Sequence, residues 1–193
     1  MAYAAASTSL TDRMIRAARL DVNLYEEVEA DTNANSQALT VVVLAALAGG
    51  IGAAIAEAMG ERGGNPVGGL VAGVLGELLG WAVWSYVMYF VGTRLFKGRA
   101  TYGELLRTLG FAYSPGVLLI LRFIPFLGGL IAIAVGIWRI VAGFIAIRQA
   151  LDLDTGNTIA TIVVGILAYV VALAVIGALL ATIGLGAAAL MRL

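Results

Sequence analysis

The carboxyl-terminal part of the chain contains a long uncharged stretch, and this feature constrains the fold more than any other. Residues 155–191, 37 in all, include no Asp, Glu, Lys or Arg. The hydrocarbon core of a bilayer is about 30 Å thick, and roughly 20 apolar residues cross it as a helix at about 1.5 Å each. Three further long apolar stretches precede this one. The sequence therefore predicts an all-α integral membrane protein.

Composition excludes several classes of function. The chain of 193 residues is 61% hydrophobic and 12% charged, which is too apolar for a water-soluble domain of this size. It has no cysteine and no histidine, so it lacks thiolate nucleophiles and the commonest general base and metal ligand. We expect no enzyme activity, no metal and no cofactor. The basic residues are scattered and balance the acidic ones, so we expect no nucleic acid partner.

Residues 1–31 are the only substantial polar stretch and are predicted to form a short amphipathic head on the membrane surface. Ser9 followed by Asp12 resembles a capping box, and the helix after it has arginines opposite its apolar side chains. This basic face either binds anionic lipid headgroups or is an ordinary topology signal; it consists of Arg13, Arg16 and Arg19. A second short helix is expected over about 21–30. The segment lacks the basic start and apolar run of a cleaved signal peptide, so none is expected.

Residues 32–193 are predicted to form one membrane domain with five transmembrane helices. The expected spans are about 38–59, 67–95, 102–124, 127–147 and 157–183, with a turn at 63–66 after the first. Pro115 interrupts the third span, so either a helix kinks there and crosses, or a short segment from about Ser114 crosses only partly. We expect the kinked crossing. Gly184 and Gly186 are expected to end the fifth span.

Small residues recur at helical spacing in the second and fourth spans and predict close helix packing. Such residues let two backbones approach, which is how helices associate when lipid removes the hydrophobic drive between them. We interpret them first as packing positions within the bundle and second as a dimer interface. The residues are Gly68, Ala72, Gly76 and Gly80 in the second span and Gly128, Ala132 and Gly136 in the fourth.

The distribution of Lys and Arg predicts the orientation, because these residues are retained on the cytoplasmic side. With the amino terminus inside, the inner segments carry eight Lys or Arg residues and the outer segments three. Five crossings then place the carboxyl terminus outside, whereas four crossings with a re-entrant segment would place it inside.

Glu77 and Arg139 interrupt the second and fourth spans near their middles, where a charge costs several kcal/mol unless it is paired or hydrated. They lie about ten and about twelve residues from the outer ends of their spans, so their depths differ by less than a helical turn. We hypothesise that they pair inside the bundle. The pair either fixes helix register or belongs to a polar pathway for an ion, a proton or an anionic headgroup.

Tyr113, Ser114 and Pro115 form a break inside the third span, where freed backbone groups need internal partners. One interpretation is a kinked helix whose freed groups are satisfied by the Ser114 hydroxyl. The other is a transporter binding site, because such sites are lined by broken helices.

Six segments, taken in order, resemble the Ypt-interacting-protein (YIP) family, in particular a prokaryotic member. They span nearly the whole chain. The segments are residues 9–16 (SLTDRMIR), 26–31 (EEVEAD) leading to 37–39 (QAL), 109–115 (LGFAYSP), 124–129 (IPFLGG), 137–138 (IW) and 150–156 (ALDLDTG).

The resemblance implies five transmembrane helices with a cytoplasmic amino terminus, here in the cytoplasmic membrane of a prokaryote. Eukaryotic members of the family lie in Golgi and endoplasmic reticulum membranes, bind prenylated Rab-type GTPases and act in vesicle traffic. This chain lacks the Asp-Leu-Tyr-Gly-Pro signature ahead of the first span, so we do not expect a Rab-type GTPase as its partner.

Three functions are compared. The first is a non-enzymatic membrane scaffold or adaptor that associates with other integral membrane proteins or with itself. The second is a transporter or channel for a small solute or ion, which would use Glu77, Arg139 and the break at Ser114 and Pro115. The third, an intramembrane enzyme, lacks histidine, cysteine and paired acids at useful spacing. We expect the first.

Overall fold

The computed structural model describes residues 9–59 and 66–190, and this part of the chain forms helices and no strand. The all-α prediction is confirmed. The turn expected just before Pro66 lies outside the described residues. The elements are α1 (Leu10–Ala18), α2 (Val22–Ala30), α3 (Ala34–Met59), α4 (Pro66–Leu95), α5 (Tyr102–Ala112), the 3₁₀ helix η1 (Ser114–Phe123), α6 (Leu127–Ala150) and α7 (Thr155–Leu190).

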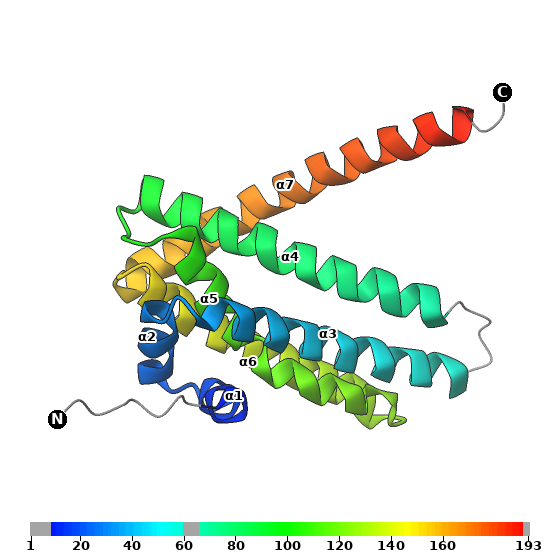
Figure 1. The fold of residues 1–193 in the computed structure, drawn as a ribbon, viewed down its shortest axis with the longest axis horizontal. Helices are drawn as coiled ribbons and strands as arrows, with labels where there is room; N and C mark the ends of the chain where they lie inside the picture. Colours follow the sequence, from blue (N-terminus) through cyan, green and yellow to red (C-terminus); the bar gives the residue numbers. More distant parts are fainter. Residues whose placement is uncertain (1–8, 60–65, 191–193) are drawn as a thin grey trace.

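Five helical segments are long and apolar enough to cross a membrane, which confirms the predicted number. The helices α3, α4 and α6 run lengthwise through the molecule, and α1 and α2 lie crosswise to them (Figure 1). We call residues 9–31 the head. The head end of the bundle is where α3 begins and α6 ends, and the far end is where α3 ends and α4 begins.

The fifth span is longer than expected. Gly184 and Gly186 were expected to end it, but α7 continues through both to Leu190 over 36 residues. That expectation is wrong because a helix in lipid keeps its own backbone hydrogen bonds, so glycine is tolerated inside a membrane helix. A helix of this length extends roughly 54 Å, well beyond the hydrocarbon core.

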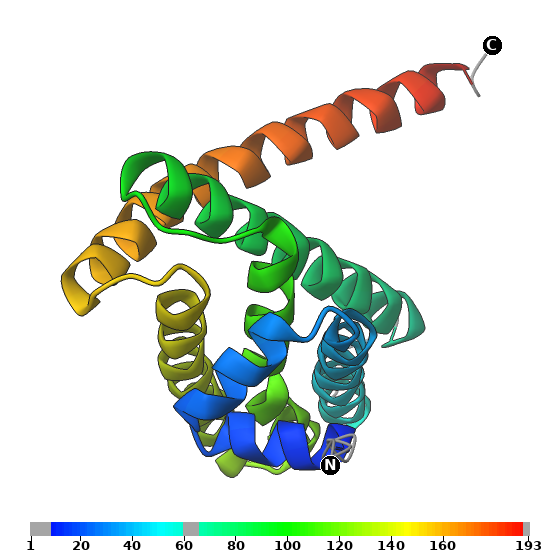
Figure 2. The same ribbon diagram turned by 60° about the vertical axis from the view of Figure 1, so that its left-hand side comes forward.

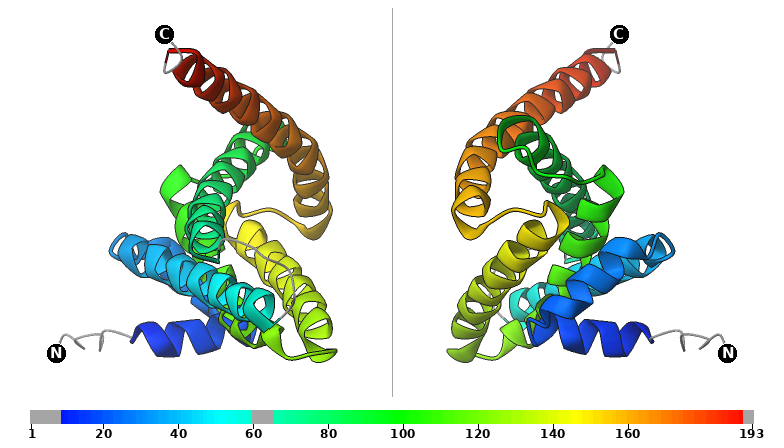
Figure 3. Two further views of the ribbon diagram at one scale, coloured as in Figure 1. Left: turned by 90° about the vertical axis from the view of Figure 1, so that its right-hand side faces the viewer. Right: turned by 90° about the vertical axis from the view of Figure 1, so that its left-hand side faces the viewer.

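The helix α7 contacts α4 near the head end and then diverges from it (Figures 1 and 2). At the contact, the Tyr169 and Trp84 rings meet edge-on with centroids 5.3 Å apart. A Cβ atom added to Gly165 would lie only 1.9 Å from Met88 Cε, so the two helices approach closely there. The far part of α7 and the helix α1 lie on opposite sides of the molecule (Figure 3).

The third span is not one kinked α-helix. It consists of α5 and the ten-residue 3₁₀ helix η1, joined at Tyr113. A 3₁₀ helix rises about 2.0 Å per residue, so η1 adds roughly 20 Å to the roughly 16 Å of α5. The 22 residues from Tyr102 to Phe123 are therefore long enough to cross fully.

The helix η1 packs on a face of small residues of α3. A Cβ atom at Gly52 would lie 2.4 Å from the Leu119 carbonyl oxygen and 2.8 Å from that of Ile120. A Cβ atom at Gly49 would lie 3.5 Å from Leu119 Cδ1. Long 3₁₀ helices are uncommon because their hydrogen bonds are strained. This close backbone contact holds η1 in place.

We expect Gly52→Ala to destabilise the protein by about 1–3 kcal/mol, the usual cost of overpacking. The effect opposes the helix propensity of alanine, which favours the substitution by up to about 1 kcal/mol. The control is Gly76→Ala, because a Cβ atom there meets nothing within 4 Å. Thermal unfolding in detergent measures both variants. Equal melting temperatures would contradict the close α3–η1 contact.

The tightly packed part of the molecule lies at the head end. Fully buried side chains there come from the head and from α3, α5 and α6, including Leu24, Tyr25, Val41, Leu105 and Ile147. By contrast, many large apolar side chains of α4 and α7 are exposed, which is expected for helices that face lipid. The head is therefore anchored on the most completely buried part of the fold.

Candidate functional site

The two head helices begin at side-chain caps. Ser9 Oγ accepts a hydrogen bond from the Asp12 backbone N–H at 3.2 Å, which confirms the cap expected at Ser9. In α2, Asp21 Oδ1 accepts one from the Asn23 N–H at 3.0 Å. The Tyr25 hydroxyl donates to the Ala17 carbonyl and joins the two helices.

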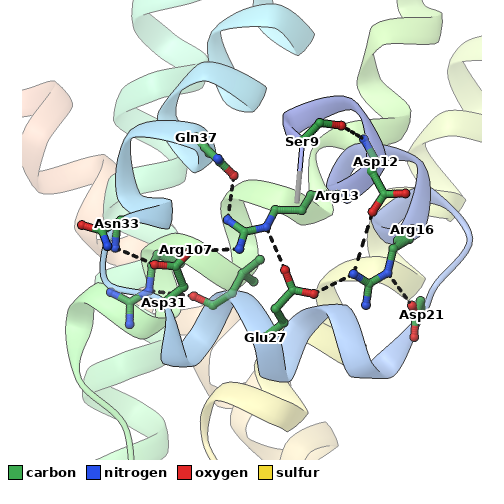
Figure 4. Close-up of polar contacts among 11 residues, drawn as sticks. Ser9, Asp12, Arg13, Arg16, Asp21, Glu27, Asp31, Asn33, Gln37 and Arg107 are labelled. Carbon is green, nitrogen blue, oxygen red and sulfur yellow. Dashed lines mark hydrogen bonds and ion pairs between the residues drawn. The ribbon is translucent and has the colours of Figure 1, made fainter. Parts of the chain in front are cut away.

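Arg13 links three parts of the chain through its guanidinium (Figure 4). Its Nε donates to Glu27 Oε1 at 2.9 Å and its Nη2 to Asp31 Oδ2 at 2.9 Å. Its Nη1 donates to Gln37 Oε1 of α3 at 2.8 Å. Arg13 is only 7% exposed, so it is not part of an exposed basic face. That prediction is wrong for Arg13 because Glu27 of α2 and Asp31, which caps the end of α2, place their carboxylates over α1.

Arg16 is also directed at carboxylates rather than at a membrane surface (Figure 4). Its Nε lies 2.8 Å from Asp21 Oδ2 and its Nη1 lies 2.6 Å from Glu27 Oε2. Of the three arginines expected on the basic face, Arg19 is the exposed one. Lipid binding by this face therefore stays a prediction for Arg19 alone.

A donor from a membrane helix caps the carboxyl end of each head helix. Arg107 of α5 is 4% exposed. Its Nε donates to the Val28 carbonyl at 2.9 Å and its Nη2 to the Glu29 carbonyl, both in the last turn of α2. Trp138 Nε1 of α6 donates to the Ala18 carbonyl of α1 at 2.7 Å. These contacts satisfy carbonyl groups that have no partner inside their own helix.

The ion pairs change the pKa values of the head carboxyls. The hydrogen bond from Arg16 lowers the pKa of Asp21, and the one from Arg13 lowers the pKa of Asp31. Burial raises the pKa of Glu27, but the hydrogen bonds from both arginines outweigh burial and the net pKa is lowered. These three groups stabilise the fold above their ordinary pKa, and this contribution is lost as pH falls through the lowered values.

Glu29 behaves in the opposite way. Burial, together with the negative charges of Glu26, Glu104 and Asp152, raises its pKa to about 7 against the opposing effect of Arg107. Its Oε2 atom is buried without a hydrogen-bond partner. A raised carboxyl pKa means that the folded state binds the proton more tightly than the unfolded state. Its contribution is therefore present below the ordinary value of 4.5 and is lost as pH rises through about 7.

We expect Glu29→Gln to raise the melting temperature at pH 8 and to change it little near pH 4.5, because the glutamine imitates the protonated acid. Thermal unfolding in detergent across this pH range measures the effect. The control is Glu57→Gln, because the Glu57 side chain is exposed. A variant whose melting temperature follows the wild-type pH profile would show that Glu29 is not the titrating group.

Glu77 and Arg139 lie together inside the bundle. Arg139 Nη2 is 2.5 Å from Glu77 Oε1, and the two side chains are 24% and 32% exposed respectively. The Arg139 guanidinium also lies over the Tyr113 ring, 3.8 Å from its centroid. The structure therefore brings together two predicted site residues and one residue of the predicted break. The role of the pair stays a prediction.

The break at Tyr113, Ser114 and Pro115 is satisfied internally. The Ser114 hydroxyl donates to the Phe111 carbonyl at 2.7 Å, and the Gly116 N–H donates to the Tyr113 carbonyl at 2.7 Å. Ser114 and Pro115 are buried. The geometry thus matches the interpretation in which the segment supplies its own hydrogen bonds.

Most small residues singled out in the sequence do not pack where expected. Gly80 faces the Tyr169 hydroxyl of α7, and Gly128 lies against the Arg122 carbonyl. A Cβ atom at Gly76 or Gly136 would meet nothing within 4 Å. The prediction that these two glycines pack against another helix of the same chain is therefore wrong. Gly68 and Ala72 are exposed and Ala132 is half-buried. Close contacts between elements are also made at glycines that we did not single out, namely Gly52, Gly110 and Gly165.

Two cavities lie beside the ion pair. The first has a volume of about 280 Å³ between α3, α4 and η1, and Glu77 contributes to its wall. The second has a volume of about 600 Å³ between α4, α5, α6 and α7, and Arg139 and Tyr113 contribute to its wall. Within the described residues, no group of three or more acidic side chains is arranged to hold a metal ion.

Arg107, Gln37 and Trp138 are site residues that the sequence interpretation missed. The available signal was Arg107, a basic residue in the second turn of a candidate span, where an internal partner is required. Its partners are the Val28 and Glu29 backbone carbonyls and the Asn35 side-chain oxygen. The pattern of charged side chains in the sequence did not indicate these partners.

A family model described as the Yip1 domain matches residues 24–190 of the chain. The match includes most of α2 and all five candidate spans. Neither a curated protein nor a solved structure matches the chain.

Proposed function

Because the chain belongs to the Yip1 domain family, we propose that it is a non-enzymatic membrane scaffold or adaptor. In this role it organises a membrane or is an accessory subunit of a membrane complex. Its partners are the transmembrane helices of other integral membrane proteins or of a second copy of the chain.

The far part of α7 is the observation that carries this proposal. Its described side chains between Val170 and Thr182 are exposed or partly exposed, because α7 has diverged from α4. Four small residues lie on one face of this part at spacings of three and four, and all are exposed: Ala174, Gly177, Ala178 and Ala181. A Cβ atom at Gly177 meets nothing within 4 Å. Such a face suits close packing against a helix from outside the chain.

The proposal includes an orientation with the head in the cytoplasmic compartment of a prokaryotic cell. The excess of basic residues on the segments at the head end supports this orientation. The exposed side of α1, with Thr11, Ile15 and Arg19, would then face lipid headgroups or a cytoplasmic protein. Arg107 and Trp138 hold the head against α5 and α6, which gives it a fixed surface suited to an adaptor.

The test is extraction of membranes in a gentle detergent, followed by quantification of co-purifying proteins and of a differently tagged second copy. We expect Gly177→Leu to lower recovery of the partner about tenfold, which corresponds to ~1.4 kcal/mol of lost association energy. The matched control is Leu179→Phe, which adds bulk on the opposite side of α7. Equal recovery with both variants would contradict association through the small-residue face.

Transport of a small solute or ion is the second candidate, and one observation favours it. The Glu77–Arg139 pair lies between two cavities and contributes a residue to the wall of each. A flux assay in liposomes tests this function, because Glu77→Gln would abolish a flux that depends on the carboxylate. Absence of flux for the wild-type chain would eliminate the candidate.

A further inference from the structure

The smaller cavity is built differently from the apolar surface around it. Its walls on α3 and α4 are mainly alanine and glycine, including Ala53, Gly69 and Gly73. Its polar residues are Glu57, Glu77 and Arg122. The volume of about 280 Å³ is several times the ~30 Å³ that one water molecule takes up in the liquid. The cavity is therefore wide enough for several water molecules.

The charged residues are arranged from the far end of the bundle inward. Glu57 lies near the end of α3 and Arg122 near the end of η1, and both are exposed. Glu77 lies about three turns from the start of α4. The cavity therefore leads from the far end toward the Glu77–Arg139 ion pair.

The Glu77 carboxylate requires a polar surrounding at this depth. The hydrogen bonds of the described residues use only its Oε1 atom, and its side chain is 32% exposed. Hydrocarbon cannot solvate the remaining carboxylate surface, and charged residues inside membranes face protein partners or water-filled cavities. Arg139 supplies one partner from the other side. Water in the cavity would supply the rest.

We propose that this cavity is an aqueous vestibule, which opens at the far end of the bundle and brings water to the Glu77 carboxylate. Arg122 in the wall, and Arg139 paired with Glu77 at 2.5 Å, balance the charges of Glu57 and Glu77, so the vestibule is polar without a net charge. The inference is independent of the scaffold role and does not require a path through the whole membrane.

The natural sequence contains no cysteine, so single introduced cysteines report water access without a background. Gly73→Cys places the thiol on the cavity wall, where an added Cβ atom meets nothing within 4 Å. Ala72→Cys is the matched control, because it is exposed at nearly the same depth on α4 but is not part of the wall. Thr11→Cys, on the exposed side of the head, marks the head side.

The full chain is placed in sealed vesicles and treated with a membrane-impermeant methanethiosulfonate. Because a thiol in apolar surroundings is protonated and unreactive, we expect Gly73→Cys to react about tenfold faster than Ala72→Cys. The reaction should occur from the side opposite to that of Thr11→Cys.

Equal rates for Gly73→Cys and Ala72→Cys would overturn the vestibule and would mean that acyl chains fill the cavity. Labelling from the head side would overturn the position of its opening. If Gly73→Cys does not fold, Ala53→Cys on the α3 wall gives the same comparison. None of these outcomes depends on whether a partner co-purifies.

Discussion

Replacing Arg13 with alanine is expected to destabilise the protein by about 3 kcal/mol, within the range for removing one partner of a buried ion pair. The guanidinium is nearly buried and is shared by Glu27, Asp31 and Gln37. Its loss leaves two carboxylates close together without their cation, so they repel each other. We therefore also expect α1 to detach from α2 and from the start of α3. Thermal unfolding in detergent and limited proteolysis within residues 9–31 measure the two effects.

Arg19→Ala is the matched control for this prediction, because Arg19 directly follows the last residue of α1 and is exposed. We expect it to change stability by less than about 0.5 kcal/mol, as is usual for a surface position. If both variants unfold at the same temperature and resist proteolysis equally, the Arg13 contacts do not hold α1 in place. Arg13→Lys should recover little, because an ammonium group cannot donate in three fixed directions as a guanidinium does.

Reversing the charge of either member of the Glu77–Arg139 pair is expected to cost at least about 3 kcal/mol, the approximate cost of an unpaired charge at membrane depth. Glu77→Arg places two cations together, and Arg139→Glu places two carboxylates together. The double exchange restores one charge of each sign at the 2.5 Å contact and should recover most of the lost stability. The fraction of monodisperse protein after detergent extraction and the melting temperature measure all three variants.

A double exchange that is no more stable than the worse single variant would show that the two residues do not interact. Coupling between them is the informative quantity, because each single variant also disturbs its own surroundings. For Arg139 these surroundings include the Tyr113 ring. Tyr113→Phe keeps the ring face and is the control for this contact.

The lengths of the apolar stretches in the sequence were sufficient to predict the five crossings, because the rise per residue of a helix and the thickness of the hydrocarbon core are both nearly constant. Counting residues from the span ends also placed Glu77 and Arg139 at one depth, and the structure has them in contact. The break at Tyr113 was evident from Pro115. What the pattern did not reveal was the 3₁₀ helix after the break, because its geometry depends on contact with the α3 backbone.

The head shows why local periodicity has limits. Helical spacing correctly put Arg13 on the polar side of α1, but an amphipathic pattern does not reveal whether water, lipid or protein meets that side. Here it is met by acids that lie 14 and 18 residues further along the chain. Similarly, α3 has two neighbouring lines of small residues, and spacing did not show that Gly52 packs on η1 while Gly50 faces Leu70 of α4.

The capping of the head helices has a consequence for biogenesis. Each of these helices has nine residues, too few for a helix to be stable in water alone. Yet the donors that complete them follow late in synthesis: Arg107 comes 79 residues after Val28, and Trp138 comes 120 residues after Ala18. The ribosome therefore releases the head long before its docking site exists. The head is translated before α5 and α6, but it completes its folding only after both have been inserted.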